Sequence, residues 1–139
     1  MPLTYTILTD LNLVYVRYQG VCTVWESQAN FDRYQKDPKA HPDQRHLVDL
    51  SRLVEFHRPP VELMKHQTQK LDIFMKARQP ILAVYFAPNR MTQSMARASL
   101  KSWEGLSCLI GMIAQEEKQA LEMLGLTASS IDDLLMKRA

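Results

Sequence analysis

Glycine and cysteine are scarce in this chain, and their scarcity removes several classes of site. The chain has four glycines in 139 residues. It contains neither a G-x-G-x-x-G loop nor a Walker A loop, because both need closely spaced glycines around a phosphate. Two cysteines, Cys22 and Cys108, make neither a disulfide framework nor a zinc site. We therefore expect a reduced, cytoplasmic protein with no cofactor and with both cysteines in or near its core.

An excess of charge of one sign and a long apolar run are also missing. The chain carries 17 basic and 15 acidic residues, for a net charge of +2, and the two signs are interspersed. Without a basic stripe, no nucleic-acid partner is expected. No apolar run approaches the roughly 20 residues of a membrane span. The opening MPLTYTILTD has no charged segment followed by a long apolar core, so no signal peptide is expected.

The composition, 46% hydrophobic over 139 residues, is that of a single globular domain, which buries enough surface to need no metal or disulfide. Thr and β-branched or aromatic runs predict five strands, and helical spacing between them predicts five helices. The predicted strands are 4–9, 13–18, 46–51, 81–87 and 107–113. The predicted helices begin near 23, 60, 90, 116 and 131. We expect an α/β fold with a mixed five-stranded sheet, in which an opening antiparallel hairpin precedes largely parallel strands. The core of the single domain, 1–139, is expected at about 4–126, with a C-terminal helix at 129–138.

Start and stop signals refine these helices. Thr23 followed by Glu26 predicts a capping box and a helix that ends near Lys36. Gly20 is expected to end the second strand. An apolar stripe on the next helix, Met64, Leu71, Phe74 and Met75, is expected to face the core. Lys76 and Arg78 are expected at the C-terminal end of that helix, where the helix dipole favours cations.

The segments VYVRYQGVCTVWE, HLVDLSRL and EEKQALEMLGL give the chain a family resemblance. With the order of elements, they resemble the STAS-like domains and especially their SpoIIAA-like branch, over roughly Thr4 to Leu126. The resemblance implies a SpoIIAA-like fold, a mixed sheet with helices packed against it. It implies no activity, and the branch is similar to lipid-binding domains only at the level of fold.

One departure from that family matters. Anti-sigma-factor antagonists of the STAS family carry an Asp-Ser-Ser-Gly turn after this strand, and its serine is phosphorylated. Here EFHRPPVE (55–62) stands in its place, without serine or glycine. Phosphorylation at that turn is therefore not expected, and the family role is not carried onto Ser51, which lies in the strand-end motif.

Candidate ligand-binding residues gather where strands end, because open α/β sheets bind ligands beyond the carboxyl ends of their strands. In PNRMTQSMAR (88–97), Asn89 or Thr92 caps a helix whose free N–H groups favour an anion. Arg90 adds positive charge, and two methionines form a soft apolar wall. The alternative is that the methionines are ordinary core residues and Arg90 is solvated. The predicted binding residues are Asp49, Ser51, Asn89, Arg90, Met91 and Met95.

A catalytic set, Asp49, Ser51 and His57, is the weakest hypothesis. A triad needs a serine held by a histidine that an acid orients, and the chain has no G-x-S-x-G nucleophile elbow. Asp49 and Ser51 are better interpreted as a strand end that caps the following turn. The four histidines form no helical i, i+4 pair and no H-E-x-x-H motif, so no metal site is predicted, and they are expected to be exposed.

These patterns favour a non-enzymatic, STAS-like protein-interaction domain that meets itself as a homodimer or another protein. The alternative is a small-molecule or lipid carrier with an apolar cavity under the helices, gated near Asn89 to Met95 and taking a small apolar or anionic ligand. Two tryptophans, Trp25 and Trp103, are either buried or mark an interface.

Overall fold

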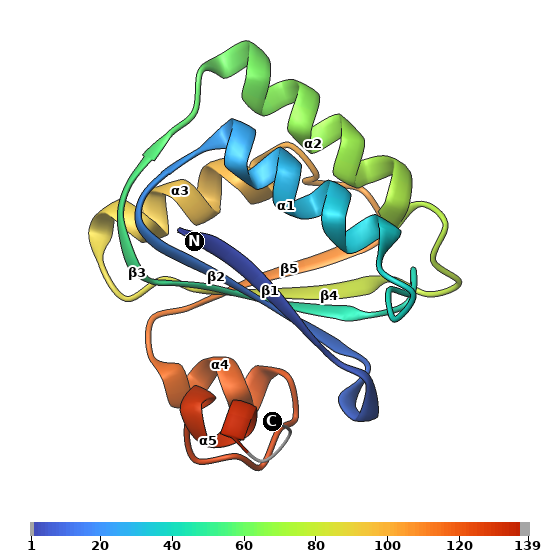
Figure 1. Ribbon diagram of the computed structural model, residues 1–139, viewed down its shortest axis with the longest axis vertical. Helices are drawn as coiled ribbons and strands as arrows, with labels where there is room; N and C mark the ends of the chain where they lie inside the picture. Colours follow the sequence, from blue (N-terminus) through green and yellow to red (C-terminus); the bar gives the residue numbers. More distant parts are fainter. Residues whose placement is uncertain (1, 137–139) are drawn as a thin grey trace.

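A mixed five-stranded sheet forms the middle layer of the computed structural model of this protein, which describes residues 2–136 (Figure 1). Its strands lie in the order β1-β2-β3-β4-β5; β1 runs antiparallel to β2, and the other neighbours are parallel. A 3₁₀ turn (Thr9–Leu11) joins the opening hairpin. The predicted α/β fold with a mixed sheet is therefore confirmed. The strands are β1 (Leu3–Leu8), β2 (Leu13–Thr23), β3 (Arg45–His57), β4 (Ile81–Phe86) and β5 (Leu109–Ala114).

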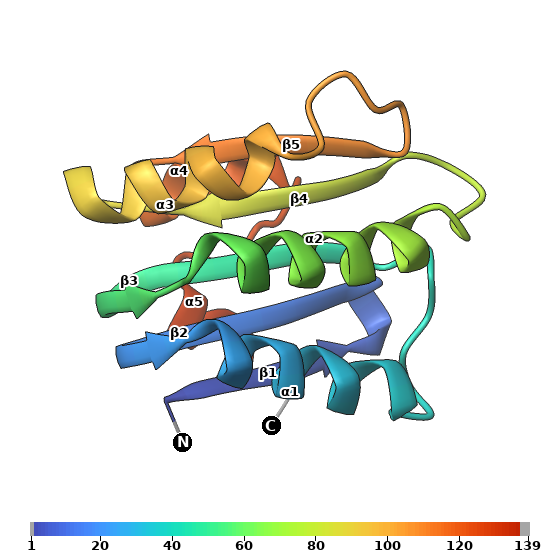
Figure 2. The ribbon, with the colours of Figure 1, turned by 90° about the horizontal axis from the view of Figure 1, so that it is seen from above.

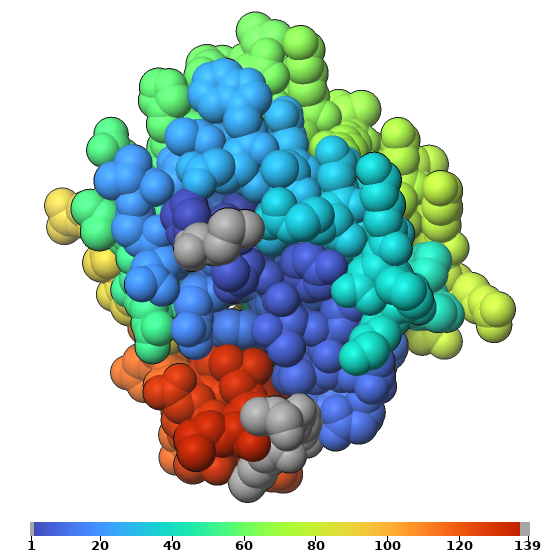
Figure 3. Space-filling model, in the orientation of Figure 1, coloured from blue at the N-terminus to red at the C-terminus, as the bar shows by residue number. Residues whose placement is uncertain are grey.

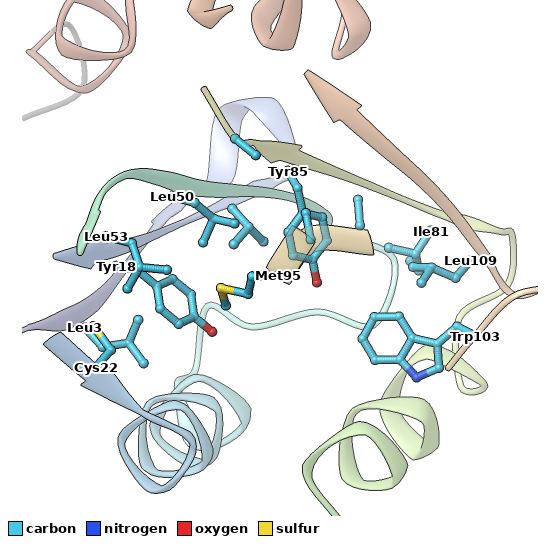
Figure 4. Packing of buried hydrophobic residues seen from close by; sticks show 14 of the residues in the cluster. Leu3, Tyr18, Cys22, Leu50, Leu53, Ile81, Tyr85, Met95, Trp103 and Leu109 are labelled. Atoms are coloured by element: carbon cyan, nitrogen blue, oxygen red, sulfur yellow. The ribbon is translucent and has the colours of Figure 1, made fainter. Parts of the chain in front are cut away.

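Helices cover both faces of the sheet. Figures 1 and 2 show α1 (Val24–Lys36), α2 (Pro60–Phe74) and α3 (Arg90–Lys101) on one face, and α4 (Glu117–Met123) and α5 (Ile131–Met136) on the other. The space-filling view shows the C-terminal helical segment (red) next to the opening hairpin (blue) (Figure 3). Because the inner strands are buried on both faces, their side chains alternate between two cores. Tyr18, Leu50 and Tyr85 join Met95 and Trp103 in the core beneath α1 to α3 (Figure 4). The opposite core contains Tyr15, Leu47, Val84, Leu121 and Leu134.

Strands β2 and β3 are longer than predicted, and Gly20 does not end β2. Gly20 has a φ of +71° and sits at a register shift between β2 and β3. A glycine at positive φ inside a strand permits a bulge, after which pairing resumes. The pairing continues to Thr23 opposite His57, whereas β3 pairs with β4 only as far as Asp49. The ends of β2 and β3 therefore form a two-stranded arm that curves towards α2 (Figure 1).

The predicted N-terminal cap of α1 is confirmed. Thr23 Oγ1 accepts a hydrogen bond from the Glu26 N–H at 3.2 Å, and Glu26 Oε1 accepts one from the Thr23 N–H at 2.9 Å. The helix ends at Lys36, as predicted. A local pattern was sufficient here because both partners of the capping box lie within one helical turn.

The predicted apolar stripe of α2 is confirmed for Phe74, which is buried, and for Leu71, which packs against the core, but it is wrong for Met64 and Met75. Met64 is 70% exposed, and Met75 lies past the helix end and is also exposed. The buried residues of α2 are His66, Gln67 and Phe74. The polar pair is buried because each finds a partner: His66 with Ser27, and the Gln67 amide with the Ser99 carbonyl oxygen at 2.6 Å. The expectation of exposed histidines fails for His66, and also for His46 on β3.

The end of α2 also differs from the prediction. α2 ends at Phe74, so Lys76 and Arg78 lie beyond it. In the C-terminal helix, Ser130 Oγ accepts a hydrogen bond from the Asp133 N–H at 3.0 Å. The predicted end of that helix, at 137–138, lies outside the described residues. Within residues 2–136, no helix has the length and apolar character that crossing a bilayer requires.

Candidate functional site

A cavity of about 40 Å³ lies between the sheet and helices α1 and α2. This volume exceeds the roughly 10–15 Å³ that one water molecule needs. The wall is largely aromatic and comes from β1 to β4, from α1 and α2, and from the segment after α3. The lining residues are Tyr5, Val14, Val16, Tyr18, Ser27, Asn30, Phe31, Tyr34, His46, Val48, Lys70, Phe74, Ala83, Tyr85 and Trp103.

Three polar side chains of this wall have no polar partner among the described residues. They are the imidazole of His46 on β3, the ammonium group of Lys70 on α2 and the hydroxyl of Tyr85 on β4. His46 is 8% exposed, Tyr85 is 4% exposed, and Lys70 is partly buried. His46 packs edge-on against the rings of Tyr34 and Phe74. Lys70 Nζ lies 5.9 Å from the ring centroid of Phe31.

Burial sets the charge of these groups. Desolvation lowers the pKa of Lys70 from 10.5 to about 8. Desolvation, together with the nearby charge of Lys70, lowers the pKa of His46 from 6.5 to about 3. Desolvation also raises the pKa of Tyr85, so its hydroxyl stays protonated. At neutral pH the cavity therefore holds one cation beside two neutral groups that can donate hydrogen bonds.

The remaining polar side chains of the wall are held in place by the protein. Tyr18 Oη, Ser27 Oγ and His66 Nε2 form a chain with distances of 2.9 and 2.7 Å. Tyr34 donates to Gln44 Oε1 at 2.6 Å, and Tyr5 donates to Asp37 at 2.9 Å. His66 Nδ1 is buried without a partner among the described residues. Burial, with the charge of Lys70, lowers the pKa of His66 to about 3.

The structure brings two of the predicted site residues together, on the face opposite the cavity. The Asp49 carboxylate accepts hydrogen bonds from the Ser51 N–H at 2.9 Å, from Ser51 Oγ at 2.6 Å and from Tyr15 Oη. Arg17 Nε donates to Tyr15 Oη at 3.1 Å. Asp49 shares its face of β3 with Leu47, which packs beneath α4 and α5. Asp49 therefore acts as a buried acceptor inside β3, at the point where the pairing with β4 ends. The prediction that Asp49 and Ser51 form a strand end that caps a turn is wrong, because β3 continues to His57.

His57 does not join Asp49 and Ser51. It lies six residues beyond Ser51 on the same strand, about 20 Å away at the rise of an extended chain. Its ring instead lies 6.0 Å from that of Trp25, measured between centroids. In this conformation the three residues cannot form a nucleophile, base and acid relay.

The other four predicted residues lie around the start of α3. Asn89 caps the helix, and its Oδ1 accepts a hydrogen bond from the Thr92 N–H at 2.9 Å. Arg90 and Met91 are exposed, whereas Met95 is buried in the core between Tyr18 and Tyr85 (Figure 4). Met95 therefore packs on the opposite face of the sheet from Asp49.

Sequence reasoning missed His46, Lys70 and Tyr85. One signal was present: His66, Lys70 and Phe74 recur at intervals of four, which places them on one face of a helix. Tyr85 and His46 lie inside the apolar runs of two central strands, where a polar atom must find a partner or a cavity. Of the two tryptophans, Trp103 is buried and Trp25 is 48% exposed.

Among residues 2–136, no group of three or more His, Cys, Asp or Glu side chains is arranged to hold a metal ion. In comparisons with known proteins, no protein-family model matches the chain and no curated protein matches it significantly.

Proposed function

We propose that this chain is a non-enzymatic, STAS-like interaction domain that associates with a second copy of itself along the outer edge of β5. The observation that carries the proposal is the character of that edge. β5 is the last strand of the sheet, and on its outer side it pairs with no strand of the described residues.

The side chains of β5 favour association. The strand reads LIGMIA, without a charge or a proline, although sheet edges that stay unpaired are commonly protected by such residues. Ile110 is 52% exposed and Met112 is 37% exposed. Gly111 keeps the strand close to α3, because a Cβ there would collide with Leu100. A groove between β5 and the end of α3 contains Leu106 and Ile113, and Arg97, Lys101 and Glu104 also line it.

A second copy fits this edge by symmetry. Two β5 strands placed antiparallel about a two-fold axis offer each other the same row of N–H and C=O groups. No charged side chain of β5 opposes that approach. The opposite edge, β1, differs because it exposes Thr4 and Thr6 instead of large apolar side chains.

The STAS-like assignment is part of this proposal and rests on the motifs around Gly20, Asp49 and Gly125 and on the order of elements. A reducing, cytoplasmic compartment is also proposed, supported by the free thiols of Cys22 and Cys108.

A charge on the β5 edge is expected to dissociate the dimer. Ile110→Lys would place two ammonium groups near each other across the two-fold axis, and like charges on paired strands destabilise pairing. We expect sedimentation velocity to show a dimer for the unaltered chain and a dissociation constant at least about tenfold weaker for the variant. Thr4→Lys, the same kind of change on the opposite edge, is the control and should leave the dimer intact.

Two results would contradict this proposal. One is an unaltered chain that sediments as a monomer up to its solubility limit and retains no partner in a pull-down from its native cell. The other is equal dissociation by Ile110→Lys and Thr4→Lys, since the β5 edge would then have no special role.

A further inference from the structure

The cavity beneath α1 and α2 is lined by three polar side chains that form no hydrogen bond with the described residues. Three elements each direct one unpartnered polar group into it: β3 with His46, β4 with Tyr85 and α2 with Lys70. Buried polar groups in folded proteins are nearly always hydrogen-bonded, and exceptions call for an explanation. His46 and Tyr85 are buried residues and Lys70 is partly buried, but their polar atoms are not sealed off, since the buried side-chain atom without a partner among the described residues is His66 Nδ1. A molecule inside the cavity can therefore reach all three groups and supply the hydrogen bonds that the chain does not.

The charge of the cavity selects the kind of molecule. Its lining contains no Asp or Glu, and Lys70 is the one residue of the lining that is charged at neutral pH. His66, one turn before Lys70 on α2, is uncharged there because its pKa is lowered to about 3. The other titratable groups in the lining are His46 and the phenols of Tyr5, Tyr18, Tyr34 and Tyr85. A cationic ligand would be repelled. A single negative charge would receive an ion pair from Lys70 and hydrogen bonds from neutral donors, which are the strong partners of an anionic oxygen.

The rest of the wall selects the shape. Phe31, Phe74 and Trp103 give the cavity an apolar, aromatic side. Such a surface favours a hydrocarbon body, while the few polar groups fix its orientation. Because the cavity has a volume of about 40 Å³, only a ligand with a short hydrocarbon chain fits without movement of α1 or α2.

We propose that the cavity between the sheet and helices α1 and α2 binds a short-chain monocarboxylate. Its carboxylate pairs with Lys70 and accepts hydrogen bonds from Tyr85 and His46, and its hydrocarbon end packs against Phe74 and Trp103. This site is separate from the β5 edge, so each proposal stands or fails alone.

Lys70 gives the binding a pH dependence. Burial lowers the pKa of its ammonium group to about 8, so the cation is lost as the pH rises through that value. A bound carboxylate favours the charged form and raises this pKa. The affinity for a carboxylate is therefore expected to fall as the pH rises above about 8, the pKa of Lys70 in the protein without ligand.

The test is a titration of ¹⁵N-labelled protein with propionate, followed by amide chemical shifts, with 1-propanol and propylamine as probes that lack the carboxylate. We expect saturable shifts with propionate at His46, Lys70 and Tyr85, and none with propylamine. Lys70→Met keeps the aliphatic stem and removes the charge, so propionate should bind about 10- to 100-fold more weakly. Lys65→Met, on the exposed part of the same helix, is the matched control and should bind as the unaltered chain does.

The Lys70→Met variant must be folded for its loss of binding to be informative. Lys70→Met removes a half-buried charge without an ion pair, so its thermal midpoint should not fall. If it does not fold, Tyr85→Phe removes only one hydroxyl and should weaken propionate by about three- to tenfold. The proposal is overturned if propionate gives no saturable shift, if 1-propanol gives the same shifts, or if the Lys70 or Tyr85 variant binds propionate as well as the unaltered chain.

Discussion

Mild acid is expected to unfold this protein, because two buried histidines take up protons only when the chain unfolds. The pKa of His46 and that of His66 are each lowered from 6.5 to about 3, chiefly by burial. Between these values the unfolded chain binds a proton at each histidine and the folded chain does not. The free energy of unfolding therefore falls as the pH drops from about 6.5 towards about 3. Above about pH 6.5 both histidines are uncharged in the folded and unfolded chain, so they add no pH dependence there.

The expected loss is large. Each histidine removes about 1.4 kcal/mol of stability per pH unit inside the window, so the pair removes nearly twice that. Small domains have about 5–15 kcal/mol in total. Lowering the pH by two to three units is thus enough to remove much of the free energy of unfolding of an ordinary domain.

Denaturant unfolding between about pH 5 and pH 6.5, above the ordinary pKa values of the carboxylates, measures this effect. His46→Phe keeps an aromatic ring in the cavity wall and should reduce the slope of stability against pH by about half. His41→Gln is the control, because the side chain of His41 is 57% exposed. A slope that is unchanged in His46→Phe, or a stability that is constant across this range, would show that His46 does not control the acid response.

Asp49→Ala is expected to lower the free energy of unfolding by about 2–4 kcal/mol. Asp49 is 4% exposed, and its carboxylate accepts from Ser51 and from Tyr15 Oη. The truncation would leave the Tyr15 hydroxyl in the core beneath α4 and α5 without its acceptor, and a buried group left unpaired carries the full desolvation cost.

The comparison with Ser51→Ala identifies the cause. That variant loses one side-chain hydrogen bond and leaves the Tyr15 contact intact, so its expected cost is only about 1 kcal/mol. Chemical denaturation at neutral pH gives both values. If the two variants had the same free energy of unfolding, the hydrogen bond between Asp49 and Tyr15 would not stabilise the fold as expected.

Elements whose signals are local were predicted well. Thr23 and Glu26 lie one turn apart and define the start of α1, and Pro38 lies just beyond its end. The five strands were located because apolar β-branched runs between turns form strands in most contexts. Element order then implied the mixed sheet, since a short link makes a hairpin and a helical link makes a parallel crossover.

The candidate site was less predictable because its geometry is not local. The rule that ligands bind at strand ends grouped Asp49 with Met95. Alternation in β3 turns Asp49 towards α4 and α5, however, whereas Met95 on α3 packs on the other face of the sheet. Met64 and Phe74 looked alike as apolar residues of one helix, but only Phe74 meets the core. His66 and Gln67 took the buried positions because Ser27 and Ser99, far away in the chain, supply their partners.

By itself the amino-acid sequence determined the α/β class, the alternation of elements and the capped start of α1, because these depend on contacts between residues close in the chain. Only the tertiary structure decided that His46, Lys70 and Tyr85 face one cavity and that β5 is left as an uncharged edge. The physical reason is that burial and pairing depend on which distant segments pack together, and periodicity within one segment does not contain that information.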